Sequence, residues 1–151
     1  SVNDQMPVYA YERLIEVFGS ISNLNVLFLG VSYRGDVGDT RYSPVESLYD
    51  IVKRKSLSVS LHDPYIDFWQ EQNCVVETDL QAALSSELDL IIISTGHSIY
   101  KKSSTIDILM KFRGVKIYDT IGLLTNDQLR GLQTRNKVSV LGRGDLIDNL
   151  E

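Results

Sequence analysis

The stretch Asn25–Pro64, NVLFLGVSYRGDVGDTRYSPVESLYDIVKRKSLSVSLHDP, decides the fold class. Its first five residues form a continuous, largely apolar run, which predicts a strand that is buried on both faces, as in a parallel sheet. Residues 45–55 carry apolar side chains at helical spacing, and Ser43 before Pro44 predicts the start of that helix. The alternating run 57–62 predicts a second strand. A strand, a helix and a strand in this order predict a parallel β-α-β unit.

The rest of the chain continues the alternation of strands and helices. Further strands are predicted over 88–97, 115–122 and 137–145, and further helices over 79–87, 105–114 and 125–135. A short helix or a loop is predicted over 65–72, and one helix precedes the first strand. We therefore predict an α/β fold, a Rossmann-like three-layer sandwich with a mostly parallel sheet, preceded by one helix. The expected division is 1–22, the end of a linker helix region, and 23–151, the Rossmann-like domain.

Composition argues against several functional classes. The chain has 15 Lys and Arg against 20 Asp and Glu, a net charge of −5, which disfavours nucleic acid as a partner. No apolar run approaches the ~20 residues of a membrane span, and the N-terminal stretch lacks the pattern of a signal peptide. One Cys and two separated His residues predict neither a disulfide framework nor a metal site. A cytoplasmic protein without nucleic-acid or membrane partners is expected.

The loop after the first strand is the main candidate for ligand binding. In an open parallel sheet, ligands bind beyond the carboxyl ends of the strands, which are expected here in the loops 30–41, 62–65, 95–100, 119–122 and 142–145, and this loop is the first of them. Its glycines do not have the spacing of the dinucleotide fingerprint. It carries Arg34, which follows the strand closely and suits a phosphate or carboxylate, and Arg41. Arg41 has an equally good structural interpretation, an ion pair with Asp39 or Asp36 that holds the long loop together.

Three other polar residues leave alternatives open. Asp63 lies at the end of the second strand, where it can bind a ribose or form a turn before Pro64. His97 lies at a strand end, and a lone histidine is more often structural than catalytic. Cys74 is interpreted as a core residue. No nucleophile with an adjacent base, no carboxylate pair and no metal cluster is evident, so no catalytic residue and no metal ligand is assigned, and we expect a domain that binds.

Several motifs together resemble the C-terminal domain of the UDP-glucose/GDP-mannose dehydrogenase family. They are Leu29-Gly30, the aromatic-basic pair Tyr33-Arg34, the Asp-x-Arg-x-Ser-Pro run 39–44, and Asp63-Pro64-Tyr65. The runs NDQMP at 3–7 and GHSIYK at 96–101 are similar to further segments of that family. The second of these runs favours the members that act on UDP-N-acetyl-hexosamines. The resemblance extends over essentially the whole chain.

The resemblance implies a role in an oxidoreductase of polysaccharide biosynthesis. Such enzymes oxidise the C6 alcohol of a nucleotide sugar to a carboxylate in two NAD-dependent steps, through a cysteine thiohemiacetal. By position, Tyr33 and Arg34 match the pair that contacts the UDP part of the substrate, and Arg41 matches the arginine that reaches toward NAD. The resemblance further implies that an N-terminal NAD-binding domain carries the catalytic cysteine, and that the full enzyme is a homodimer. The isolated chain is then expected to be inactive.

Two departures from the family pattern stand out. Arg34 replaces the more usual lysine, which keeps the charge but changes its geometry. The family's Asp-x-Arg-Asn run appears here as Asp119-Thr120-Ile121-Gly122, without the arginine. The substrate expected from the resemblance is a UDP-N-acetyl-hexosamine or UDP-glucose. The alternative is a Rossmann-like nucleotide-binding module, or a dimerisation module, of another class.

Overall fold

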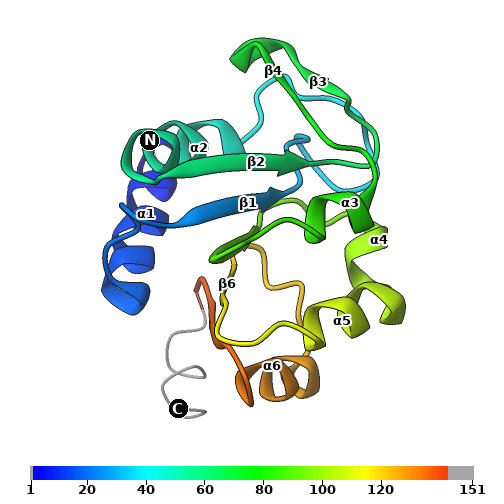
Figure 1. The fold of residues 1–151 in the computed structure, drawn as a ribbon. Coiled ribbons are helices and arrows are strands. Elements are labelled where there is room, and N and C mark those ends of the chain that lie inside the picture. The colour runs from blue at the N-terminus through cyan, green and yellow to red at the C-terminus, as the bar shows by residue number, and fades with distance from the viewer. Residues whose placement is uncertain (1, 143–151) are drawn as a thin grey trace.

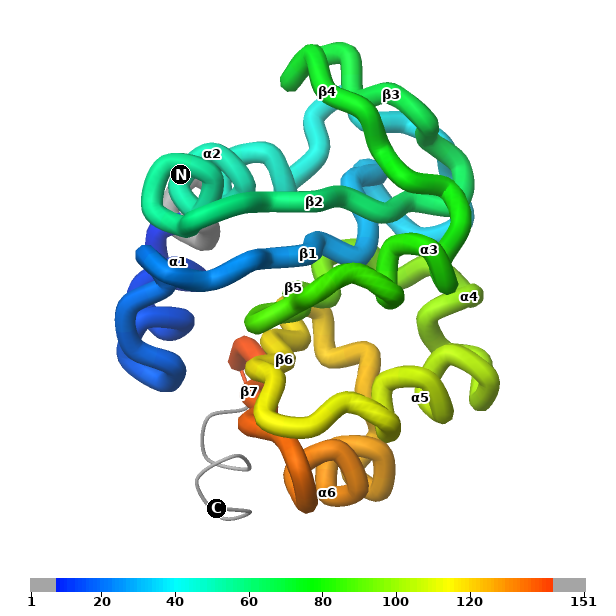
Figure 2. The backbone as a smooth tube through the Cα atoms, in the orientation of Figure 1, coloured from blue at the N-terminus to red at the C-terminus, as the bar shows by residue number. Residues whose placement is uncertain are grey.

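The computed structural model describes residues 2–142, with side chains from Val8 onward. The main sheet has five strands, all parallel, in the order β2-β1-β5-β6-β7 (Figure 2). These strands are β1 (Asn25–Leu29), β2 (Ser58–His62), β5 (Leu90–Ile93), β6 (Lys116–Asp119) and β7 (Lys137–Val140). The predicted α/β sandwich with one preceding helix is confirmed, and its main sheet is entirely parallel.

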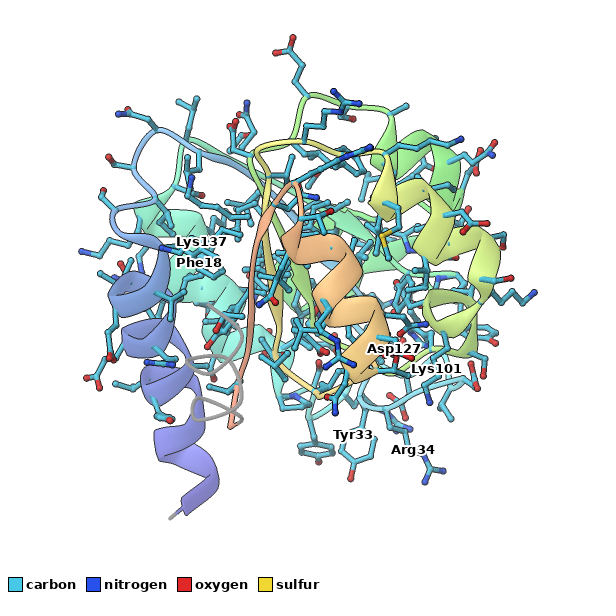
Figure 3. The ribbon with its side chains drawn as sticks, turned by 90° about the horizontal axis from the view of Figure 1, so that it is seen from below. Phe18, Tyr33, Arg34, Lys101, Asp127 and Lys137 are labelled. Atoms are coloured by element: carbon cyan, nitrogen blue, oxygen red, sulfur yellow. The ribbon has the colours of Figure 1, made fainter. Side chains whose placement is uncertain are left out.

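Helices cover both faces of this sheet (Figures 1 and 3). On one face lie α1 (Val2–Phe18) and α2 (Val45–Lys55). The other face is covered by α3 (Leu80–Leu84), α4 (Ser98–Lys101), α5 (Ser103–Met110) and α6 (Asn126–Gln133). Alternate residues of the central strands β1 and β5 enter one of two hydrophobic cores, which explains why residues 26–29 and 90–93 are all apolar.

The preceding helix α1 packs directly on the sheet. Leu14 and Phe18 belong to the same core as Phe28 of β1, and the Tyr118 hydroxyl of β6 donates to the Ala10 carbonyl at 2.7 Å. Gly19 has a φ of 80°, a left-handed conformation that ends a helix with little steric cost. The helix α1 therefore ends at Phe18, just before Gly19.

Two short segments differ from the sequence-based prediction. Within 65–72, the structure has strand β3 (Phe68–Trp69) and the 3₁₀ turn η1 (Gln70–Gln72), and β3 pairs antiparallel with β4 (Cys74–Val75). The prediction of a helix or loop was therefore wrong for Phe68 and Trp69. The segment after β5, expected as a loop, contains the single-turn helix α4.

Candidate nucleotide-binding site

A cavity of about 520 Å³ opens at the carboxyl ends of the central strands. The chain runs from β1 outward to β2 and then returns to β5 on the other side of β1, so the loops after β1 and β5 diverge. Such a switch point is where open α/β sheets bind ligands. The loops after β1, β5 and β6 line the cavity with Tyr33, Arg34, Gly35, Pro44, Ser94, Thr95, Gly96, Lys101, Ile121, Gly122 and Leu123.

The charge of this lining favours an anion. Arg34 contributes positive charge from the loop after β1 and Lys101 from α4, and no carboxylate lines the cavity among the residues that the structure describes. Figure 3 shows Tyr33, Arg34 and Lys101 at the same end of the molecule. Tyr33 is 52% exposed and offers a flat aromatic face beside Arg34. A guanidinium, an ammonium and an aromatic ring suit a ligand with phosphates and a planar base.

Two glycines allow the loops after β1 and β5 to approach each other closely. A Cβ on Gly35 would lie 2.2 Å from the Gly96 carbonyl oxygen, and one on Gly30 would lie 2.3 Å from the Thr95 Cβ. Gly30 also has a φ of 105°, which a residue with a side chain rarely adopts. The main chain beside Arg34 is therefore packed directly against the main chain of the neighbouring loop.

Asp63 is fully buried beneath the first loop. Its Oδ2 accepts from the backbone N–H groups of Val31 (2.9 Å) and Ser32 (3.1 Å) and from the Ser32 hydroxyl (2.8 Å). Its Oδ1 accepts from the backbone N–H of Tyr65 at 2.9 Å. Burial acts to raise the pKa of Asp63, but hydrogen bonds from His97, Tyr65 and Val31 outweigh it and lower the pKa below its usual value. Asp63 thus holds the main chain at Val31 and Ser32, in the loop that carries Arg34.

His97 is also fully buried and connects three loops. Its Nε2 lies 2.8 Å from Asp63 Oδ2, and its Nδ1 accepts from the backbone N–H of Asp36 at 2.9 Å. The Asp36 carboxylate in turn accepts from the backbone N–H of Ser98 at 2.8 Å and from the Ser98 hydroxyl. These bonds from Ser98 lower the pKa of Asp36. Both ring nitrogens of His97 are therefore used inside the protein, which supports the structural alternative.

Arg41 does not line the cavity. Its Nε and Nη2 atoms bond the two carboxylate oxygens of Asp39 at 3.1 and 2.9 Å, and its backbone N–H donates to Asp39 Oδ1. The hydrogen bonds from Arg41 lower the pKa of Asp39 to about 2. The Arg41 side chain is 75% exposed. The structure therefore contains the Arg41–Asp39 ion pair that the sequence offered as an alternative. Arg34 lines the cavity, and Arg41 does not.

The remaining candidates lie away from the cavity. His62 is buried, with Nδ1 2.8 Å from the Tyr100 hydroxyl and Nε2 3.2 Å from the Thr78 carbonyl oxygen, and burial lowers its pKa. Cys74 is partly buried, with Sγ 3.8 Å from the Tyr49 hydroxyl, in agreement with a core role. Across residues 2–142, His, Cys, Asp and Glu side chains form no group that could hold a metal ion.

The cavity lies at three of the strand-end loops that the sequence predicts, but sequence reasoning did not name all of its lining residues. Lys101 lies just beyond the loop predicted after β5, and α4 turns it toward the cavity. Ile121 stands where the resemblance expects an arginine, and it is 43% exposed. The rule that ligands bind at strand ends points to both segments, but it does not specify which side chains face the cavity. Of the last predicted loop, 142–145, only Gly142 lies within the described residues.

The chain is similar to known proteins of one family. The sequence model of the UDP-glucose/GDP-mannose dehydrogenase family, UDP binding domain, matches residues 27–126, which include every residue of the cavity lining. A UDP-N-acetyl-D-mannosamine dehydrogenase from Methanococcus vannielii is 28% identical over 151 residues, covering 95% of this chain and 33% of that protein. Another from Methanococcus aeolicus is 33% identical over 111 residues, covering 72% of this chain and 24% of that protein.

Solved structures share the fold. An NDP-N-acetyl-D-galactosaminuronic acid dehydrogenase from Methanosarcina mazei Go1 has a TM-score of 0.78 at 23% identity, over 94% of this chain and 30% of that one. A UDP-D-ManNAc dehydrogenase from Pyrococcus horikoshii has a TM-score of 0.75 at 24% identity, over 94% and 32%. The chain thus spans about a third of the length of the proteins that it matches.

Proposed function

The chain belongs to the UDP-glucose/GDP-mannose dehydrogenase family, as its UDP-binding domain, and from this premise we propose that its cavity binds the nucleotide part of a UDP-sugar. The observation that carries the proposal is the position of a carboxylate-free cavity with two cations at the switch point of the sheet. Tyr33 contacts the substrate with its ring, and Arg34 binds a phosphate. Lys101 provides a second positive charge where Ile121 replaces the arginine of the family pattern.

The reaction that this domain serves is the NAD-dependent oxidation of the sugar C6 alcohol to a carboxylate. The relatives named above are dehydrogenases of N-acetylated amino sugars, which supports a UDP-N-acetyl-hexosamine over UDP-glucose. NAD, when bound, supplies the hydride acceptor. A further NAD-binding domain of the same enzyme holds the cofactor and the catalytic cysteine, and the enzyme works as a cytoplasmic homodimer.

Arg41 is proposed to reach toward that NAD. Its side chain is largely exposed, and Asp39 bonds only its Nε and Nη2 edge. The ion pair with Asp39 fixes the direction of the side chain, so that one edge of the guanidinium stays available to a phosphate or a ribose hydroxyl.

Within residues 2–142, no helix has both the length and the apolarity that a bilayer crossing requires.

The test is calorimetric titration of the chain with UDP at millimolar concentration. Replacement of Arg34 by Ala is expected to weaken binding about tenfold, or ~1.4 kcal/mol, because it removes a charge-assisted hydrogen bond to phosphate. Arg54→Ala is the matched control, since Arg54 is an exposed arginine of α2 whose Nε bonds the Asp50 carbonyl oxygen.

Two outcomes would contradict the proposal. One is the absence of both heat and chemical-shift changes with UDP. The other is tighter binding of NAD, coenzyme A or an adenine nucleotide than of UDP, which would favour a nucleotide-binding module of another class.

A further inference from the structure

We propose that Ile121 is a specificity-determining residue, whose side chain contacts the methyl group of an N-acetyl substituent on the sugar that the cavity binds. Ile121 belongs to the cavity lining and stands where the resemblance expects an arginine. The inference rests on the proposed function and extends it from the nucleotide to the sugar. The ligand that Ile121 selects is a UDP-N-acetyl-hexosamine in preference to a UDP-hexose.

The cavity lining has a charged part and an apolar part. Arg34 and Lys101 carry its positive charge, whereas the loop after β6 contributes Ile121, Gly122 and Leu123, none of which has a polar side chain. The loop after β5 lies between the loops after β1 and β6, because the strand order is β1-β5-β6. Such a lining suits a ligand that carries phosphates at one part and an apolar group at another.

The main chain of the loop after β6 is held in place at several points. Asp119, the last residue of β6, is fully buried, and its carboxylate accepts from the backbone N–H groups of Ile121 at 3.1 Å and Leu124 at 2.9 Å. Thr120 donates to the Ile93 carbonyl oxygen of β5 through its backbone N–H at 3.0 Å and its hydroxyl at 2.8 Å. Because these bonds involve no side-chain atom of Ile121, this side chain can be replaced without the loss of any of them.

The space beside the end of the Ile121 side chain is open. A Cβ on Gly96 would have a single neighbour within 4 Å, the Ile121 Cδ1 at 3.5 Å, among the described residues other than those adjacent to Gly96 in the chain. Both residues line the cavity. A group of about the size of a methyl therefore fits there in ordinary van der Waals contact with Ile121.

The chemistry of a UDP-sugar indicates which of its groups reaches this space. The base and the sugar lie on opposite sides of the diphosphate, so a base at Tyr33 and a phosphate at Arg34 leave the sugar for the rest of the cavity. Gly96 packs against Gly35 of the first loop and lies next to Ile121, which places Ile121 across the loop after β5 from Tyr33. Sugar hydroxyls need polar partners, which Ile121 does not offer, whereas an acetyl methyl gains from apolar contact.

The experiment is calorimetric titration of the whole 151-residue chain with UDP, UDP-glucose, UDP-N-acetylglucosamine and UDP-N-acetylmannosamine. UDP-N-acetylglucosamine differs from UDP-glucose only by an acetamido group in place of the C2 hydroxyl, and the mannosamine ligand presents this group in the other configuration. The unchanged chain is expected to bind one of the N-acetylated ligands about fourfold more tightly than UDP-glucose, the effect of burying one methyl group. Ile121→Ala should reduce this ratio to about one.

Two further variants isolate the contact. Ile121→Val keeps a branched apolar side chain and should retain most of the preference for the N-acetylated ligand. Leu57→Ala is the matched control, because it also removes an exposed aliphatic side chain, but from the residue before β2, at the end of the sheet opposite to the cavity. Its affinities for all four ligands should equal those of the unchanged chain.

Three results would overturn the inference. The first is an unchanged chain that binds UDP and UDP-glucose as tightly as both N-acetylated ligands, which would leave the proposed function intact. The second is a preference that Ile121→Ala does not reduce. The third is an equal loss of affinity for UDP and for the UDP-sugars in Ile121→Ala, which would show that Ile121 contacts the nucleotide. A chain that binds none of the four ligands would refute the proposed function, and this inference with it.

Discussion

At the scale of single residues, Asp63 shows how a buried carboxylate can shape a binding loop. It accepts hydrogen bonds from Val31 in the loop after β1, from His97 in the loop after β5, and from Tyr65 in its own turn after β2. A carboxylate with so many donors stays ionised because each bond favours the charged form. These bonds connect the loop that carries Arg34 to the ends of β2 and β5.

Replacement of Asp63 by Asn is expected to lower the free energy of unfolding by about 2 kcal/mol or more at neutral pH, because bonds to a charged acceptor are lost. The folded-state pKa of Asp63 is lowered, so its stabilising contribution is present above the unfolded value of about 3.9 and disappears as the pH falls through the folded value. Urea denaturation from pH 7 to acid should therefore show the two proteins converging. A difference that persists unchanged in acid would contradict this account, and the exposed Asp67→Asn is the control.

Lys101 provides a second test at this scale. Lys101→Ala is expected to weaken UDP binding about fivefold, and less at high salt, because an exposed cation acts through a screened charge. Lys102→Ala removes the adjacent lysine, which does not line the cavity, and should leave the affinity unchanged. Calorimetry at two salt concentrations measures both effects. Equal losses in the two variants would show a general charge effect and not a binding contact.

At the scale of elements, local sequence signals predicted most of the structure. Thr125 starts α6 with a complete capping box, in which Thr125 Oγ1 accepts from Gln128 N–H at 3.2 Å and Gln128 Oε1 accepts from Thr125 N–H at 2.9 Å. Asp79 caps α3 in a similar way, and Ser43 Oγ accepts from Val45 N–H where α2 begins. The elements β3, β4 and α4 were missed because their two to four residues show neither a period nor the continuous apolar run that marks a buried strand such as β5.

Loss of the capping box should be measurable. Thr125→Ala is expected to reduce the free energy of unfolding by about 1 kcal/mol, because the Gln128 N–H at the start of α6 loses its side-chain acceptor. Thr125→Ser retains the hydroxyl and should cost much less. Urea denaturation of the two variants makes the comparison, and an equal loss in both would assign the effect to the methyl group instead of the cap.

At the scale of the whole molecule, the reversal of strand order between β2-β1 and β5-β6-β7 creates the site. The loops after β1 and β5 diverge there, and the loop after β6 closes one side. Close approach of Gly35 to Gly96 then joins the two diverging loops above Asp63 and His97. The exposed Tyr33 is part of the lining of this cavity.

The purified chain is expected to bind UDP without oxidising a UDP-sugar. It spans about a third of the length of its relatives, and no cysteine lines the cavity among the residues that the structure describes. The measurement is NADH absorbance with NAD and UDP-N-acetyl-hexosamines or UDP-glucose. NADH formation that depends on the chain would show that the reaction does not need a separate NAD-binding domain.

The sequence by itself determined the order of the five main-sheet strands and of the helices other than α4, and the family. It could do so because apolar periodicity, caps and the Asp-x-Arg-x-Ser-Pro run are properties of neighbouring residues. Only the tertiary structure decided which polar residues meet. His97 contacts Asp63, which lies 34 positions away in the chain, and Asp36, which lies 61 positions away. Arg34 lines the same cavity as Lys101 because three strand ends converge there. Such contacts depend on strand order and on close main-chain approach, which no local pattern encodes.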